Sequence, residues 1–195
     1  MTHLKRALSL APLLVLLSAC ASQPESIHYY LLSNPDHLSD LNKPQAKQKV
    51  VLQSLELAEY LQSRHIVMQL STNKLQFSNK HRWAENLHVS VEKALLNSLN
   101  QQSQDILYLN RKQLGDGTAQ HLFVELKHFL ITENSTAVVS GNFWVKGESK
   151  DLNIHSFNIK RDLSRDGYPH AIEQLTTALS ELATRIRLVL EQNEA

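Results

Sequence analysis

The residue best suited to chemistry is Cys20, the single cysteine in a chain of 195 residues. It directly follows Leu17, Ser18 and Ala19. A thiol is a strong nucleophile once it is deprotonated, and the small residues before it would give a peptidase access to the chain. With one cysteine, the chain cannot form an internal disulfide or a cysteine-rich zinc site.

The residues before Cys20 have the features of an export signal. Lys5 and Arg6 give a positive start, and a mostly apolar run follows from residue 8 to residue 17. The run is too short to span a bilayer, which needs about 20 apolar residues, so it is typical of a secretory signal. The sequence Leu-Ser-Ala-Cys resembles a bacterial lipobox, in which the cysteine thiol is joined to a diacylglycerol and the signal is cut before the cysteine.

The alternative is an ordinary signal peptide with a chance cysteine near its end. We favour the lipoprotein because the only cysteine falls at the position that a lipobox needs. Ala21 follows it where an Asp would disfavour export to the outer membrane in enteric-type bacteria. We therefore expect a signal peptide at residues 1–19, and a lipidated cysteine and tether at residues 20–27. We expect no cofactor, apart from the diacylglycerol and the acyl chain that are covalently attached to Cys20.

The composition describes one globular domain without a charge bias. Hydrophobic residues make up 42% of the chain and charged residues 20%, which is enough apolar sequence for a core. The formal charge is +1, and removal of residues 1–19 with their two cations changes it to −1. A nucleic-acid binder would show a basic excess. Membrane attachment would come from acyl chains rather than from net charge.

The remaining chain alternates between strand and helix patterns and predicts a single α+β domain over residues 28–192. Apolar runs and alternation predict strands at 28–32, 50–57, 65–70, 75–77, 106–109, 122–131, 136–146 and 153–163. Three- and four-residue spacing predicts helices at 80–101, with Asn79 as the N-cap, and at 169–191. We expect an antiparallel β-sheet with both long amphipathic helices packed on one face, where the sheet buries their apolar sides.

No catalytic motif stands out from the sequence. The chain lacks the nucleophile elbow G-x-S-x-G, the zinc motif H-E-x-x-H and the phosphate-binding P-loop. The residues 115–117 predict a turn rather than a phosphate loop. His81 and His88 could share a face of the first predicted helix, but two histidines make a poor metal site. We therefore expect no enzyme, no catalytic residues and no metal site.

Two stretches of the chain resemble the PqiC family. Residues 55–67 contain Tyr-Leu, Arg and Ile-Val in the order of that family's Leu-Pro-x-Tyr-Leu…Arg…Ile-Val segment. Residues 82–87 read Arg-Trp-Ala-Glu-Asn-Leu and are similar to its Arg-Trp-Ala-Glu-Pro-Leu segment. Ala58 and Asn86 stand where the family often has proline, which affects the local backbone more than the fold.

The resemblance implies an outer-membrane lipoprotein that faces the periplasm and serves as an auxiliary component of ABC-type transport. Its implied partners are an MCE-domain protein that spans the periplasm and that protein's inner-membrane partner, in a system implicated in lipid movement and envelope integrity. It implies no catalytic role. The alternative is a structural or assembly lipoprotein of the envelope without a role in lipid transport.

Tyr60, Leu61 and Arg64 are the candidate partner contacts, because they join two predicted strands outside regular structure. The alternative is that Tyr60 and Leu61 only cover the edge of the sheet. We expect Trp83 to be a core anchor rather than part of a partner surface. Arg82 and Glu85, three apart on the predicted helix, could form an ion pair.

The mature chain of 176 residues is too small to enclose a lipid conduit by itself. Its helices can cover only one face of the sheet, so the other face and the strand edges remain open to partners. We therefore expect a homo-oligomer that caps the MCE partner, with a ring as the candidate form, because closed rotational symmetry gives a central opening.

Overall fold

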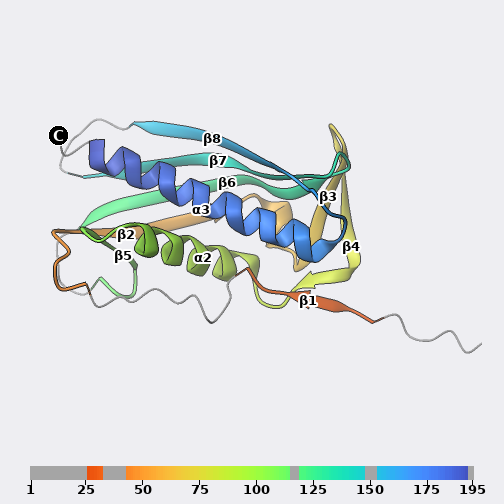
Figure 1. Ribbon diagram of the computed structural model, residues 1–195, viewed down its shortest axis with the longest axis horizontal. Coiled ribbons are helices and arrows are strands. Elements are labelled where there is room, and N and C mark those ends of the chain that lie inside the picture. The colour runs from red at the N-terminus through yellow and green to blue at the C-terminus, as the bar shows by residue number, and fades with distance from the viewer. Residues whose placement is uncertain (1–25, 33–42, 115–118, 148–152, 193–195) are drawn as a thin grey trace, which may run out of the picture.

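One eight-stranded sheet and two long helices form the computed structural model (Figure 1). It describes residues 26–32, 43–114, 119–147 and 153–192. The predicted signal peptide, Cys20, most of the tether and the turn at residues 115–117 lie outside the described residues.

The strands follow the predicted order along the chain. They are β1 (His28–Tyr30), β2 (Gln48–Leu57), β3 (His65–Ser71), β4 (Lys74–Trp83), β5 (Ile106–Asn110), β6 (Gln120–Thr132), β7 (Thr136–Lys146) and β8 (Ile154–Asp162). The helices are the short 3-10 turn η3 (Glu59–Gln62), α2 (Leu87–Gln102) and α3 (Tyr168–Gln192).

The sheet is built around β6, its longest strand. One path runs β1-β4-β3-β6-β2-β5, and β7 pairs with β6 and β8. β2 lies along the first part of β6, from Val50 opposite Gln120 to Leu57 opposite Leu126, whereas β3 meets β6 only near Ile131. Along one side, β6 therefore changes partner from β2 to β3.

The predicted α+β class is confirmed, but the sheet is mixed rather than wholly antiparallel. The hairpins β3–β4, β6–β7 and β7–β8 are antiparallel. The pairs β1–β4, β2–β5, β2–β6 and β3–β6 are parallel. The parallel pairs join strands that are distant in the chain, and only such crossovers allow parallel pairing.

Both helices cover the same face of the sheet, as the sequence predicts. They lie side by side, with α2 over β2 and β5 and α3 over β7 and β8 (Figure 1). α3 buries an apolar stripe that includes Leu175, Leu179, Leu182 and Ile186, each 0% exposed. Burial of one such side chain stabilises the fold by about 1.5–3 kcal/mol, so the stripe holds α3 on the sheet.

The start of the first long helix differs from the prediction. β4 continues to Trp83, and α2 begins only at Leu87, with Asn86 rather than Asn79 as the N-cap. The Asn86 side chain accepts a hydrogen bond of 2.9 Å from the backbone N–H of His88. Trp83, Leu87 and Val91 follow one another at intervals of four residues. Trp83, the last core residue of the strand, therefore continues the apolar spacing of the helix backwards, and the pattern predicts a helix that starts too early.

The later start also separates two pairs that a helix over residues 80–101 would have brought together. His81 belongs to β4, while the ring of His88 on α2 bonds the Leu55 carbonyl at 2.8 Å, so the two do not share a helix face. Glu85 accepts hydrogen bonds from Ser90 and Lys93, each at 2.8 Å, and not from Arg82. The expected Arg82–Glu85 pair is therefore wrong, because these residues do not lie on one helical turn.

Within the described ranges, no helix is long and apolar enough to cross a membrane. Nor do three or more His, Cys, Asp or Glu side chains in those ranges gather in a way that could hold a metal ion.

Candidate functional site

The η3 turn lies where β2 leaves the central strand. Ala58 donates its N–H to the Leu126 carbonyl at 2.9 Å, and the β6–β7 register then shifts between Leu126 and His128. The Tyr60 hydroxyl donates to the Lys127 carbonyl at 2.9 Å and lies 3.0 Å from Nδ1 of His128. Tyr60 thus bonds backbone of β6 at a bulge between the parts paired with β2 and β3.

Burial raises the pKa of Tyr60 to about 12, so its hydroxyl remains a donor over the physiological pH range.

Ala58 has φ −50° and ψ 144°, a backbone conformation that proline can also adopt. Proline has no N–H, so it could not donate to the Leu126 carbonyl as Ala58 does. The departure from the family pattern at this position therefore adds a hydrogen bond.

The three candidate contacts have different environments. Leu61 is 1% exposed and belongs to the core, so it has no surface for a partner, which corrects its place among the contacts. Tyr60 is half-buried, and Arg64 is exposed, with its carbonyl accepting from the Trp83 N–H at 2.7 Å. Contact with a partner stays a prediction for Tyr60 and Arg64.

A groove of about 750 Å³ runs between the two helices. α2 contributes Ala94, Asn97, Ser98 and Gln101 to its lining, α3 contributes residues from Pro169 to Ser180, and residues 30–32 line it as well. Hydroxyl, amide and aliphatic groups dominate the lining, and Glu173 is the one charged residue among the described residues that form it. Such a surface suits an uncharged segment or ligand rather than a phosphate or a metal ion.

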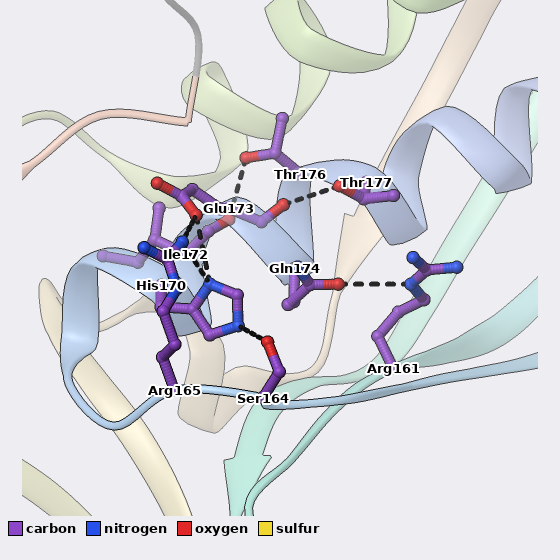
Figure 2. Close-up of polar contacts among 9 residues, drawn as sticks. All are labelled: Arg161, Ser164, Arg165, His170, Ile172, Glu173, Gln174, Thr176 and Thr177. Atoms are coloured by element: carbon purple, nitrogen blue, oxygen red, sulfur yellow. Dashed lines mark hydrogen bonds and ion pairs between the residues drawn. The ribbon is translucent and has the colours of Figure 1, made fainter.

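A polar cluster lies beside this groove at the start of α3 (Figure 2). The His170 ring lies between Ser164, whose Oγ is 3.3 Å from Nε2, and Glu173, whose Oε2 is 3.1 Å from Nδ1. Arg165 also reaches Oε2 of Glu173 at 3.2 Å. The His170 side chain is 8% exposed and that of Glu173 is 61% exposed.

Ser164, His170 and Glu173 are the residue types of a catalytic triad, in which a hydroxyl is the nucleophile, a histidine is the base and a carboxylate orients the histidine. In such triads the carboxylate is buried. Here the carboxylate is open to water and is shared with Arg165. The cluster instead connects the β8–α3 loop to the first turn of α3 by hydrogen bonds. Gly167, directly before that turn, has φ +106°. The sequence analysis missed this cluster; the spacing of His170 and Glu173 on one helix face was the available signal.

Stacked rings hold β1 against the rest of the fold. The His81 ring stacks on the Tyr168 ring with their centres 3.8 Å apart. The His28 ring also stacks on the His81 ring, with their centres 5.2 Å apart. Tyr30 and Nδ1 of His81 share a hydrogen bond of 2.8 Å. Burial lowers the pKa of His81, and the nearby charges of His28 and Lys80 lower it further. The neutral ring is therefore favoured in the folded protein.

The comparisons with known proteins identify the family of the chain. Residues 30–187 match the family described as ABC-type transport auxiliary lipoprotein component, and the chain belongs to that family. The match runs from the end of β1 into the last turns of α3 and confirms the resemblance predicted from residues 55–67 and 82–87. No curated protein shows a significant match to the chain.

Solved structures share the fold at low sequence identity. One is the crystal structure of an uncharacterized protein, with a TM-score of 0.73 and 19% identity, covering 85% of this chain and 99% of that one. Another is protein XCC0632 from Xanthomonas campestris, of the DUF330 family, with a TM-score of 0.62 and 17% identity, covering 88% and 96%. These likenesses show the fold alone.

Proposed function

We propose that this lipoprotein is a non-catalytic outer-membrane component of an MCE-type intermembrane lipid-transport system, and that it supports envelope integrity. In this role Cys20 carries the lipid anchor, and the domain docks on the periplasm-spanning MCE-domain protein. The family match over residues 30–187 carries the proposal, because it covers nearly the whole folded domain. The lipobox-like sequence at residues 17–20 supports the anchor.

The described surface supports a docking role more than a catalytic one. The inter-helix groove is lined mainly by uncharged groups, and the Ser164–His170–Glu173 cluster has an open carboxylate. Among the residues that the structure describes, in contrast, no helix covers the other face of the sheet. An uncovered sheet face and edge strands are surfaces that proteins use for association.

The anchor is tested by replacing its thiol. Cys20→Ser should leave the protein unprocessed or soluble in the periplasm, because serine cannot form the thioether to diacylglycerol. Ser22→Ala, which keeps the cysteine two residues away, should fractionate with the outer membrane like the wild type. Mass spectrometry that finds an unmodified mature N-terminus on the wild-type protein would contradict the proposal.

Docking is tested by capture of an MCE-domain protein from the same organism. Arg64→Glu should weaken capture about tenfold, which corresponds to about 1.4 kcal/mol, because Arg64 is an exposed cation at the β2–β3 connection. Arg111→Glu, at an exposed site after β5, should leave capture unchanged. If the wild type captures no MCE-domain protein, a lipoprotein of envelope assembly becomes the better explanation.

A further inference from the structure

We infer that a pocket between the β3–β4 and β6–β7 hairpins binds a phosphoethanolamine group, with the phosphate at Lys160 and the ammonium at Glu133. This group is the headgroup of a phospholipid and also occurs in soluble phosphate esters. The inference rests on the proposed function for one point only, a membrane lipid as the source of the group.

The pocket has a volume of about 480 Å³ and brings together segments that are distant in the sequence. The β3–β4 hairpin contributes residues between 69 and 72, the β6–β7 hairpin contributes residues between 132 and 138, and β8 contributes Lys160. The β6–β7 turn is fixed against β3, because the Glu133 N–H donates to the Gln69 carbonyl at 2.9 Å. Ligand sites typically have volumes of about 300–1,000 Å³, so the pocket has room for a small polar group.

The pocket lies on the face of the sheet away from α2 and α3. Val138 and Lys160 are neighbours in register on β7 and β8, so their side chains lie on one face. The next pair, Val139 and Ile159, is 0% and 1% exposed and packs in the core beneath the helices. Because successive side chains alternate along a strand, Val138 and Lys160 point the other way. The pocket is therefore separate from the groove between the helices.

Two opposite charges line this pocket without neutralising each other. Glu133 and Lys160 are both exposed, and neither side chain forms an ion pair within the part of the chain that the structure describes. They approach from different sides, because β6, which leads into the Glu133 turn, and β8 are two strands apart, or about 10 Å. A ligand that carries both charges would satisfy both side chains at once.

The uncharged lining favours a phosphate as the negative group. Ser71 and Thr72 each contribute a hydroxyl, and Asn134 contributes an amide. Phosphate oxygens accept several hydrogen bonds, and hydroxyl, amide and ammonium groups can donate them. The Glu133 carboxylate attracts an ammonium and repels a ligand that is wholly anionic. An ethanolamine ester of phosphate meets both conditions, whereas a glycerol ester lacks the cation.

The test uses the full-length processed lipoprotein in dodecyl maltoside micelles. Titration calorimetry follows the binding of glycerophosphoethanolamine, which is the soluble headgroup of phosphatidylethanolamine without its acyl chains. Glycerophosphoglycerol, which has the phosphate but no ammonium, is the comparison. The ethanolamine probe should bind about fivefold more tightly, which is the upper range for one solvent-exposed ion pair.

Two variants separate the roles of the two charges. Lys160→Gln should weaken the binding of both probes about fivefold, because both carry the phosphate. Glu133→Gln should weaken only the ethanolamine probe, so that the two probes then bind alike. Lys112→Gln, at an exposed site after β5, is the matched control and should change neither affinity.

Three results would overturn the inference. One is the absence of any binding of glycerophosphoethanolamine at millimolar concentration. Another is equal affinity of the wild type for the two probes, because the ammonium would then have no partner at Glu133. The third is an equal loss of affinity in Lys160→Gln and Lys112→Gln, because the binding would then depend on overall charge rather than on the pocket.

Vesicles distinguish the two sources of the group. Lys74→Cys places an environment-sensitive fluorophore at an exposed site beside the pocket, and Cys20 does not react because it is acylated. A response to vesicles of phosphatidylglycerol with phosphatidylethanolamine, but not to phosphatidylglycerol alone, would support the inference with a lipid as the source. A response only to glycerophosphoethanolamine would support it with a soluble ester as the source.

The same protein separates this inference from the proposed function. If the anchor and the capture of the MCE-domain protein both stand but neither probe binds, only the inference is overturned. If the anchor or the capture fails while glycerophosphoethanolamine still binds through Lys160 and Glu133, the proposed function falls and the pocket stands.

Discussion

Trp83 ends β4 inside the core and links three parts of the fold. Its side chain is 2% exposed and its ring lies 6.1 Å from that of Phe129 on β6. The backbone N–H of Trp83 donates to the Arg64 carbonyl at 2.7 Å, which ties β4 to the residue before β3. Asn86, three residues later, is the N-cap of α2, so the chain passes from sheet to helix directly after the buried Trp83 ring.

Removal of this ring should be costly. Trp83→Ala should lower the free energy of unfolding by about 3–5 kcal/mol, because a buried indole leaves a large cavity. Trp144→Ala is the control: Trp144 stacks on Phe123 on the face away from the helices and is half-buried, so its loss should cost less. Denaturant unfolding measures both, and an unchanged midpoint for Trp83→Ala would place the ring at an interface instead.

His81, which packs β1 against the rest of the fold, should make the stability of the protein depend on pH. Burial lowers its pKa from 6.5, so the folded state binds fewer protons than the unfolded state. The stabilisation is therefore full above pH 6.5 and is lost as the pH falls through the lower folded-state pKa. His81→Phe keeps a ring on Tyr168 but cannot titrate, so its stability should fall less between pH 7 and 5. Equal slopes in thermal unfolding would contradict this.

The residues differed in how far their sequence context could predict them. The burial of Trp83 followed from its type, because a large aromatic ring beside an apolar pattern is best placed in a core. Its strand conformation did not, because the four-residue interval to Leu87 matches a helix equally well. Leu61 was predicted as a partner contact because the irregular connection around it suggested a surface loop, yet its side chain fills the core.

At the scale of the elements, the β6–β7 hairpin brings two backbones very close together at Gly141. A Cβ atom on Gly141 would lie 1.8 Å from the Glu125 carbonyl oxygen, at the register shift near Leu126. Neither backbone can move without breaking the ladder that joins β6 to β7 and β8. Glycine is required here because of space, since its conformation is that of the strand.

Gly141→Ala should therefore destabilise the protein by about 1–3 kcal/mol or more, the usual cost of overpacking a tight site. Gly147→Ala is a matched control near the end of the same strand, because its Cβ would meet only the flexible side chain of Gln120, at 3.8 Å. Thermal unfolding of both variants provides the comparison. Similar melting temperatures would mean that β6 and β7 separate locally at little cost.

The elements themselves were largely predictable, and their pairing was not. The strand at 136–146 and the stripe of α3 follow from local alternation and helical spacing, which short-range sequence contains. The parallel pairs β2–β6 and β1–β4 depend on contacts between segments separated by whole elements. The groove between α2 and α3 likewise arises from helix packing, and no single segment encodes it.

At the scale of the whole molecule, the face of the sheet away from the helices combines polar and aromatic groups. Asn142 bridges Glu125 and Ser156 through hydrogen bonds of 2.9 Å across three strands. Farther along the strands, Phe123 and Trp144 stack 5.3 Å apart, and Lys146 lies 5.0 Å above the Phe123 ring. Ile154 pairs in register with Trp144 and is 56% exposed. The exposed Ile154 beside the Phe123–Trp144 stack gives this edge an apolar spot that a second copy could cover.

The last prediction concerns assembly through this edge. The protein lacking residues 1–19, with Cys20 replaced by serine, should form a closed homo-oligomer in light scattering. Ile154→Asp should shift it to smaller species, because a carboxylate on the edge strand β8 opposes both burial and strand pairing. Val89→Asp, at a 41% exposed site on α2, should not. A strict monomer at high concentration that also fails to bind the MCE-domain protein would contradict both the ring and the docking role. A monomer that still binds it would remove only the ring, because one copy would then suffice for docking.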